Sequence, residues 1–285
     1  MTVPEFSGKI GIERLAHIRT EALTQETSYA VEASILYSES VSGFQFDYLW
    51  YPNTQHRRLF VFFSGDALRK TNNPPVFQRW SWARHFPGSC LFVSDPSLYL
   101  NPDLGLAWYS GTTDFDPLPV ISERVGHIAQ QLGLAQSDIY AYGSSGGGFA
   151  ALRFAALNDD VGALAINPQT SISAYKSSNV EKYYSTCFSG LSRVEMTNKF
   201  PLRTSLLALS EKLRGKRIVL AQNTEDTHHL KSHFTPFCTA MGVPADHAPD
   251  DSRLRRLFFT VEGGHKKAED SETFQKIIAL VNAGI

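Results

Sequence analysis

The sequence predicts an α/β protein in which helices cover a mostly parallel central sheet. From Leu59 onward, short runs of continuously apolar residues alternate with segments of helix length. Strands that are buried on both faces of a parallel sheet have this composition. The region before Leu59 instead has the pattern of an antiparallel hairpin. The chain has 285 residues, of which 42% are hydrophobic, so we expect a single domain over residues 1–285 with one insertion.

The expected hairpin consists of residues 29–37 and 44–51, which alternate between apolar and polar side chains. Residues 38–43 are rich in serine and end in a glycine, as a turn between two strands does.

The later apolar runs predict the strands of the parallel part of the sheet. They are residues 59–63, 90–93, 139–142, 162–166, 217–221 and 257–261. Apolar residues recur at helical spacing in two of the segments outside these runs. The two helical faces are Val120, Ile121, Val125, Ile128 and Leu132, and Phe274, Ile277, Ile278 and Val281.

The interval 167–216 is long for a connection between two strands and contains several aromatic residues. Structureless loops of this length are uncommon in compact domains. We therefore expect a helical cap at about 168–215, where the substrate would be selected.

Charge and hydropathy exclude some classes of partner. The 27 basic and 28 acidic side chains nearly balance, so the overall charge favours neither nucleic acid nor an anionic membrane as a partner. Residues 1–10 have no apolar core of signal-peptide length, and no later stretch is long and apolar enough for a membrane helix. These features predict a cytoplasmic protein. The 3 cysteines are widely spaced and are expected to be free thiols.

The segment Gly143-Ser144-Ser145-Gly146-Gly147 follows one expected strand and precedes an alanine-rich helix. A strand, a tight turn flanked by glycines and a helix are the setting of a nucleophile elbow, which predicts Ser145 as the nucleophile. The amide of Gly146 would then point toward a developing oxyanion. Ser144 is the local alternative, but it has Tyr142 two residues before it. No lysine follows the glycines, so the turn is not a P-loop.

A serine nucleophile needs a histidine base and a carboxylate that orients this base. His265 follows the last expected strand and two glycines. Asp226 follows the preceding strand and is the expected acid, with its neighbour Glu225 as the alternative. The second oxyanion donor is expected after residues 59–63, among the backbone amides of Gly65 and Asp66.

Other polar and aromatic residues are candidates for the substrate site. Trp108 and Tyr109 follow the expected strand 90–93, and the polar turn 167–169 follows another strand. His228, His229 and His233 come directly after the expected acid. His229 and His233 would share a helical face, as metal ligands do, but no third-ligand motif is apparent. We expect no metal or other cofactor, and we place His229 near the acid or the substrate.

With Ser145, Asp226 and His265 in the order serine, acid, histidine, the chain resembles the α/β-hydrolase superfamily from about Leu59 to its end. The resemblance implies a sheet of the eight-stranded type, with the N-terminal hairpin as its antiparallel edge. Ser64 stands where many esterases of this superfamily have a histidine. The elbow and the run Asp226-Thr227-His228-His229 are also similar to superfamily members that move acetyl groups onto or off bacterial polysaccharides.

These residues support three hypotheses of function. The first is a serine hydrolase that cleaves a carboxylic ester of a small molecule or glycan through an acyl-enzyme on Ser145. The second is an O-acyltransferase that uses the same acyl-enzyme but passes the acyl group to a glycan. The third, from another class, is a non-catalytic binding protein with a hydrolase fold. The number of subunits is left open.

Overall fold

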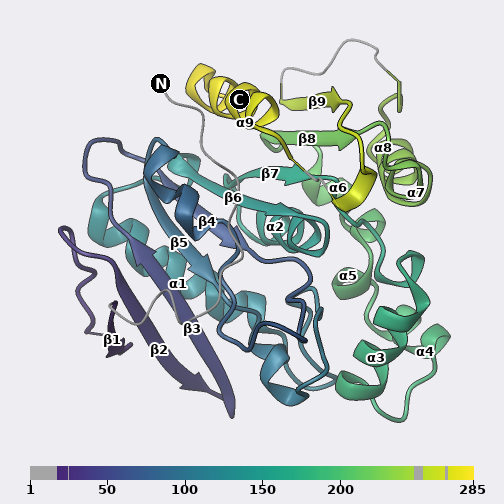
Figure 1. The fold of residues 1–285 in the computed structure, drawn as a ribbon, viewed down its shortest axis with the longest axis horizontal. Coiled ribbons are helices and arrows are strands. Elements are labelled where there is room, and N and C mark those ends of the chain that lie inside the picture. Colours follow the sequence, from purple (N-terminus) through teal and green to yellow (C-terminus); the bar gives the residue numbers. More distant parts are fainter. Residues whose placement is uncertain (1–17, 25, 247–252, 267–268) are drawn as a thin grey trace.

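The computed structural model describes residues 18–24, 26–246, 253–266 and 269–285. Its strands form one 9-stranded sheet in the order β1-β2-β3-β5-β4-β6-β7-β8-β9 (Figure 1). The strands are β1 Arg19–Ala22, β2 Ile35–Val41, β3 Phe44–Tyr51, β4 Leu59–Phe63, β5 Ser89–Val93, β6 Ile139–Ser144, β7 Gly162–Ile166, β8 Ile218–Asn223 and β9 Leu254–Phe259. From β5 to β9 all neighbouring strands are parallel, as the apolar runs predict.

The helices connect these strands and cover the sheet. The α-helices are α1 Pro117–Leu132, α2 Gly146–Leu157, α3 Ser177–Cys187, α4 Arg193–Lys199, α5 Pro201–Thr204, α6 Ser210–Leu213, α7 Thr227–His229, α8 Thr235–Met241 and α9 Ser271–Ala283. The short 3-10 helices are η2 Trp80–His85, η3 Pro96–Leu100, η4 Gln136–Asp138, η5 Ile172–Ala174, η6 Leu206–Leu209 and η8 Gly264–Lys266. A π-helical turn, η7 Leu230–Phe234, joins α7 to α8.

The N-terminal hairpin is confirmed, but its boundaries differ from those expected. The strand β2 begins at Ile35 rather than at residue 29, and it continues through the serine-rich stretch to Val41. The turn consists only of Ser42 and Gly43, whose φ angles of 52° and 82° are left-handed, as a two-residue hairpin turn requires. Serine is polar enough to suggest a loop, yet Ser38 is paired with Asp47 across the two strands.

The sheet has one more strand than the resemblance implies, because β1 pairs in parallel with β2. The β1 sequence, Arg-Thr-Glu-Ala, is polar and short, so it contains no apolar pattern that predicts a strand. The strands β2, β3 and β5 are antiparallel neighbours, which places the expected antiparallel part at this end of the sheet.

The two faces of the sheet bury different side chains. In β4, Phe60 and Phe62 belong to a cluster with residues of η2 and α9. Leu59, Val61 and Phe63 belong to a cluster with residues of α1 and α2 on the opposite face. Both faces of β4 are therefore buried, which is why its sequence is an uninterrupted apolar run.

The interval 167–216 consists mainly of short helices, from η5 to α6, as expected for a cap. Figure 1 shows α3, α4 and α5 on the side to which the arrowheads of β7 and β8 point. Tyr183 and Phe188 are fully buried among the apolar residues of this segment, next to residues of α2. Among the described residues, the helices are too short or too polar to cross a membrane. All the cysteines are buried free thiols. Residues 1–10, on which the prediction about a signal peptide rests, lie outside the described residues.

Candidate functional site

The turn between β6 and α2 holds Ser145 in an unusual backbone conformation. Its φ and ψ angles are 55° and −121°, a backbone conformation that residues other than glycine rarely adopt. A Cβ on Gly143 would lie 2.2 Å from the carbonyl oxygen of Gly147, and a Cβ on Gly147 would lie 2.2 Å from that of Phe63. Only glycine fits at these two positions, so the glycines that flank Ser145 allow the tight turn.

Ser145, His265 and Asp226 form a continuous chain of hydrogen bonds. The Nε2 atom of His265 lies 3.0 Å from Oγ of Ser145, and its Nδ1 atom lies 2.8 Å from Oδ2 of Asp226. The three residues follow β6, β9 and β8, which end at the same edge of the parallel sheet. The alternative acid, Glu225, is exposed and makes no ion pair with a histidine among the described residues.

Asn223, which sequence reasoning did not select, connects the loops that carry Asp226 and His265. It is the last residue of β8, and its side-chain amide donates to the carbonyl oxygens of Val261, at 2.9 Å, and Gly264, at 3.2 Å. Its side-chain oxygen accepts from the amide of Glu225 at 3.1 Å. Asn223 thereby links the backbone before His265 to the backbone before Asp226. Its place at a strand end was the only signal in the sequence.

His229 is a second histidine partner of Asp226. Its Nδ1 atom lies 3.1 Å from Oδ1 of Asp226, and its backbone amide donates to the same oxygen at 3.2 Å. The ring of His229 stacks on that of His265, with centroids 4.0 Å apart and planes 6° from parallel. His229 is almost completely buried, so its contacts are with Asp226 and His265 rather than with the surface.

The hydrogen bonds to Asp226 govern its protonation. Burial by itself raises the pKa of this carboxyl group, but the hydrogen bonds with His229 and His265 outweigh that effect and hold the pKa below its ordinary value. Asp226 is therefore ionised at neutral pH. An ionised carboxylate only accepts hydrogen bonds, so it favours the tautomer of His265 that carries a proton on Nδ1 and turns the Nε2 lone pair toward Ser145.

Two backbone amides near Ser145 have no hydrogen-bond acceptor among the described residues. One belongs to Gly146, the first residue of α2, where helix amides have no partner within the helix. The other belongs to Asp66. The amide of Gly65 instead donates to Oε1 of Gln78 at 2.9 Å, so it is occupied. A Cβ built on Gly65 would lie 3.7 Å from Cβ of Ser145, which shows how closely this loop approaches Ser145.

Gln169 makes a further contact with Ser145. Its Nε2 atom donates to Oγ of Ser145 at 2.9 Å, while its Oε1 atom accepts from the indole of the fully buried Trp108. The indole thereby determines which end of the amide faces the serine. Trp108 was expected to line the substrate site, and the structure places it behind Gln169. The sequence signal for Gln169 was the polar turn at the end of β7.

Tyr109 is also fully buried and positions the loop after β4. Its hydroxyl group donates to the carbonyl oxygen of Val93 at 2.6 Å and accepts from the amide of Ser64 at 2.8 Å. Trp108 and Tyr109 have φ angles of 54° and 52°, which bulky residues adopt only at an energetic cost. The structure therefore places Tyr109 beneath the loop that carries Gly65 and Asp66, and not where it would contact a substrate.

Ser144, the alternative nucleophile, faces a different set of partners. Its Oγ atom accepts a hydrogen bond from Arg79 at 2.7 Å. Arg79 also forms an ion pair with Glu269, at 3.0 Å, and Glu269 accepts a hydrogen bond from Tyr142. Ser144 thus has a cation beside it and no histidine, among the described residues, to take its proton. Neither Arg79 nor Glu269 belongs to a sequence motif, so only the tertiary structure reveals their ion pair.

The buried histidines limit where a metal ion would bind. One ligand atom each from Asp226, His229 and His265 lies within 4.8 Å of the others. An ion there would compete with the hydrogen bonds that both rings make to Asp226. The rings of His229 and His233 are 5.0 Å apart, but Nδ1 of His233 accepts from the amide of Thr170 at 3.2 Å.

His233 makes the folded state sensitive to acid. Burial, with a smaller effect of the neighbouring histidines, lowers its pKa to about 3. Between that value and the ordinary histidine pKa of about 6.5, the unfolded chain binds a proton that the folded chain does not. The stability from this residue is therefore complete above about pH 6.5 and decreases as the pH falls, by up to about 1.4 kcal/mol per pH unit.

Urea unfolding at pH 7.0, 5.5 and 4.5 tests this expectation, with His233→Gln as the comparison. Glutamine has an oxygen that accepts from the Thr170 amide but does not titrate in this range. The free energy of unfolding of the variant is expected to decrease less steeply with falling pH than that of the wild type. Equal slopes for the two proteins would show that His233 is not responsible.

Comparisons with known proteins agree with this arrangement of strands. No protein-family model and no curated protein matches the sequence. A variant of the capsule O-acetyltransferase of Neisseria meningitidis serogroup A, in complex with CoA, has a TM-score of 0.57 and 17% identity, over 87% of this chain and 94% of that chain. The acetyl xylan esterase from Paenibacillus sp. R4 has a TM-score of 0.57 and 14% identity, over 89% of this chain and 86% of that chain. A fungal esterase from Rhizomucor miehei has a TM-score of 0.56 and 12% identity, over 89% of this chain and 84% of that chain. The chain has the α/β-hydrolase fold.

The α/β-hydrolase fold explains why residues far apart in the sequence meet at one point. Parallel strands all direct their C-terminal ends to one edge of the sheet, so the loops after β4, β6, β7, β8 and β9 gather there. Asp66, Ser145, Gln169, Asp226 and His265 belong to these loops or strand ends in that order. At these low identities the comparisons concern the fold alone.

Proposed function

We propose that this protein is a serine-dependent enzyme that acts on carboxylic esters through an acyl-enzyme on Ser145. The observation that carries the proposal is the hydrogen-bonded chain Ser145–His265–Asp226, with Ser145 on a strained turn at the start of α2. A buried carboxylate, a neutral imidazole and a serine hydroxyl in this order are the components of nucleophilic acyl transfer.

In the proposed first half-reaction, Oγ of Ser145 forms a bond to the acyl carbon while its proton passes to Nε2 of His265. The carbonyl oxygen becomes negatively charged, and the amides of Gly146 and Asp66 supply hydrogen bonds to it. The intermediate then collapses, the bond to the leaving oxygen breaks, and His265 returns the proton to that oxygen. Asp226 stays ionised throughout and stabilises the imidazolium ion.

In the second half-reaction, the oxygen of a hydroxyl compound forms a bond to the acyl carbon while its proton passes to His265. The bond between that carbon and Oγ of Ser145 then breaks, and His265 returns the proton to Oγ. If water attacks, the enzyme is a hydrolase and releases a free acid. If the hydroxyl of a sugar attacks, the enzyme is an O-acyltransferase. One of the structurally similar proteins is an O-acetyltransferase, and this chain matches 94% of its length. This similarity supports the second candidate. The helical segment at about 168–215 would then select the substrate, and the cytoplasmic location stays a prediction.

A non-catalytic binding protein is the third candidate, and the geometry opposes it. The strained conformation of Ser145 costs free energy, as do the left-handed conformations of Trp108 and Tyr109. A protein that only binds a partner has no use for this strain at a serine beside a histidine.

Labelling with a fluorophosphonate tests the proposal directly. The reagent forms a phosphonate ester with a serine, with loss of fluoride, only when a base activates the hydroxyl group. We expect one label per chain in the folded wild type, located by mass spectrometry of peptides on Ser145, and none after denaturation. A folded protein that takes up no label, or that carries it on Ser144, would contradict the proposal.

A further inference from the structure

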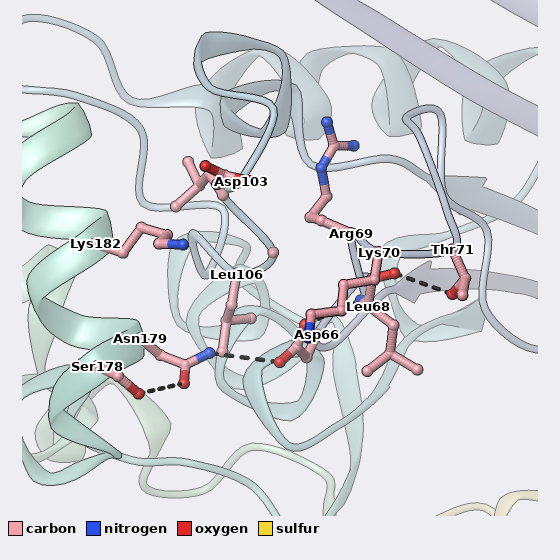
Figure 2. A pocket seen from close by; sticks show the side chains of 12 residues that line it. Asp66, Leu68, Arg69, Lys70, Thr71, Asp103, Leu106, Ser178, Asn179 and Lys182 are labelled. Atoms are coloured by element: carbon pink, nitrogen blue, oxygen red, sulfur yellow. Dashed lines mark hydrogen bonds between the residues drawn. The ribbon is translucent and has the colours of Figure 1, made fainter.

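A cleft of about 560 Å³ lies beside the proposed catalytic site. One wall is the loop after β4, with Leu68, Arg69 and Lys70, and the opposite wall is the first part of α3, with Asn179 and Lys182 (Figure 2). In Figure 2 the ammonium group of Lys182 points away from α3 toward the opposite wall.

Two residues in the wall of the cleft belong to the surroundings of Ser145. Asp66, whose backbone amide is a proposed oxyanion donor, belongs to its wall. Leu106, another wall residue, packs against the start of α2, because a Cβ on Gly146 would lie only 2.5 Å from Cδ1 of Leu106. A substrate with its acyl carbon at Ser145 therefore has this cleft next to it, on the side of the oxyanion loop.

Among the described residues, the cations of the cleft form no ion pair with a carboxylate. Within the part of the chain that the structure describes, neither Lys70 nor Lys182 is within ion-pair distance of a carboxylate, and Arg69 donates only to the carbonyl oxygens of Pro102 and Asn72. These hydrogen bonds leave the charge of Arg69 uncompensated by a bonded anion.

Two carboxylates also line the cleft, Asp66 and Asp103. The oxygens of Asp66 accept from the amide of Leu68 at 3.0 Å and from the side chain of Asn179 at 3.4 Å, so both face protein donors. Asp103 acts on Arg69 only at longer range. Three cations against two carboxylates leave an excess of positive charge in the cleft, and the two lysines are free to approach a ligand.

We propose that this cleft binds an anionic group of the substrate, carried on the part of the molecule that is not the acyl group. This inference rests on the proposed function, since it places the anion beside the oxyanion loop. A phosphate of an acyl donor and a carboxylate of an acidic glycan both present negatively charged oxygens to the cations of the cleft. A small neutral ester would react at Ser145 without reaching the lysines.

Calorimetric titration of the Ser145→Ala protein tests the cleft without depending on turnover. The probes are coenzyme A, which carries phosphates, trigalacturonic acid, which carries carboxylates, and neutral maltotriose. We expect at least one anionic probe to bind, maltotriose not to bind, and the dissociation constant of the anion to rise with salt. The anion that binds more tightly identifies the source of the charge.

The lysines are tested in the same Ser145→Ala background. The double substitution Lys70→Ala and Lys182→Ala is expected to weaken anion binding by about 10-fold or more, because each unpaired cation contributes a few-fold at a solvated site. Lys212→Ala, an exposed lysine on α6 outside the cleft, is the matched control and should stay within about 2-fold. Circular dichroism and thermal unfolding verify that each variant is folded.

Two outcomes would overturn the inference: neither anion binds, or the double variant binds the anion as tightly as the Lys212→Ala control does. Failure of the proposed function has a different signature, because it appears as absent fluorophosphonate labelling of the wild type while anion binding to the cleft persists.

Discussion

Replacing Ser145 by alanine is expected to lower kcat/KM for an activated acetyl ester by about 10⁴- to 10⁶-fold, with only a minor effect on the affinity for substrate. Alanine removes the hydroxyl oxygen that lies 3.0 Å from Nε2 of His265, and with it the nucleophile of the proposed acyl-enzyme. What remains is the uncatalysed attack of water, assisted by the amides near the site. Initial rates with p-nitrophenyl acetate, corrected for spontaneous hydrolysis, measure the effect.

Ser144→Ala is the matched control, because it removes a hydroxyl group from the adjacent residue. Ser144 is hydrogen-bonded to Arg79 and not to His265, so we expect a loss of about 10-fold at most. Equal losses in the two variants would point to a disturbed turn rather than to a lost nucleophile. A larger loss for Ser144→Ala would transfer the role of nucleophile to that residue.

Replacing Asp226 by asparagine is expected to lower kcat/KM by about 10⁴-fold. An asparagine keeps the size of the side chain but brings an amino group that donates where the carboxylate accepts. The ring of His265 would then take the other tautomer, with the proton on the nitrogen that faces Ser145. Because Asp226 also accepts from His229, the substitution removes the negative charge that both stacked rings contact through Nδ1.

Glu225→Gln distinguishes the two acids that the sequence leaves open. Glu225 is exposed, so its amide counterpart is expected to keep activity within about 2-fold of the wild type. Rates of the two variants with the same ester, measured from pH 5 to pH 9, provide the comparison. A loss in Glu225→Gln that exceeds the loss in Asp226→Asn would reverse the assignment.

The predictability of the strands depended on how fully each was buried. The strands β4 and β7 were predicted to the residue, because all their side chains are buried and their sequences are therefore continuously apolar. By contrast, β9 begins at Leu254 and ends at Phe259, whereas residues 257–261 were expected. It contains Arg255 and Arg256 and lies at the edge of the sheet, where polar residues are tolerated and the apolar run no longer marks the strand.

The residues of the candidate site also differed in how well the sequence predicted them. Ser145, Asp226 and His265 were accessible to prediction because each follows a strand in a fixed order, and the structure brings them together. Trp108 and Tyr109 were candidates for the substrate site, with packing in the core as the default for aromatic residues, and they are fully buried and contact Gln169 and Ser64. Local sequence does not distinguish an aromatic residue that lines a site from one that supports it.

By itself, the sequence determined the class of fold, the alternation of strands and helices, and the turn that carries Ser145, because apolar periodicity and glycine sterics are local properties of a chain. The tertiary structure alone decided which groups share Asp226, which amides near Ser145 are free, and that Arg69, Lys70 and Lys182 line one cleft. Those facts depend on contacts between segments up to about a hundred residues apart, and the packing of the whole sheet sets such contacts.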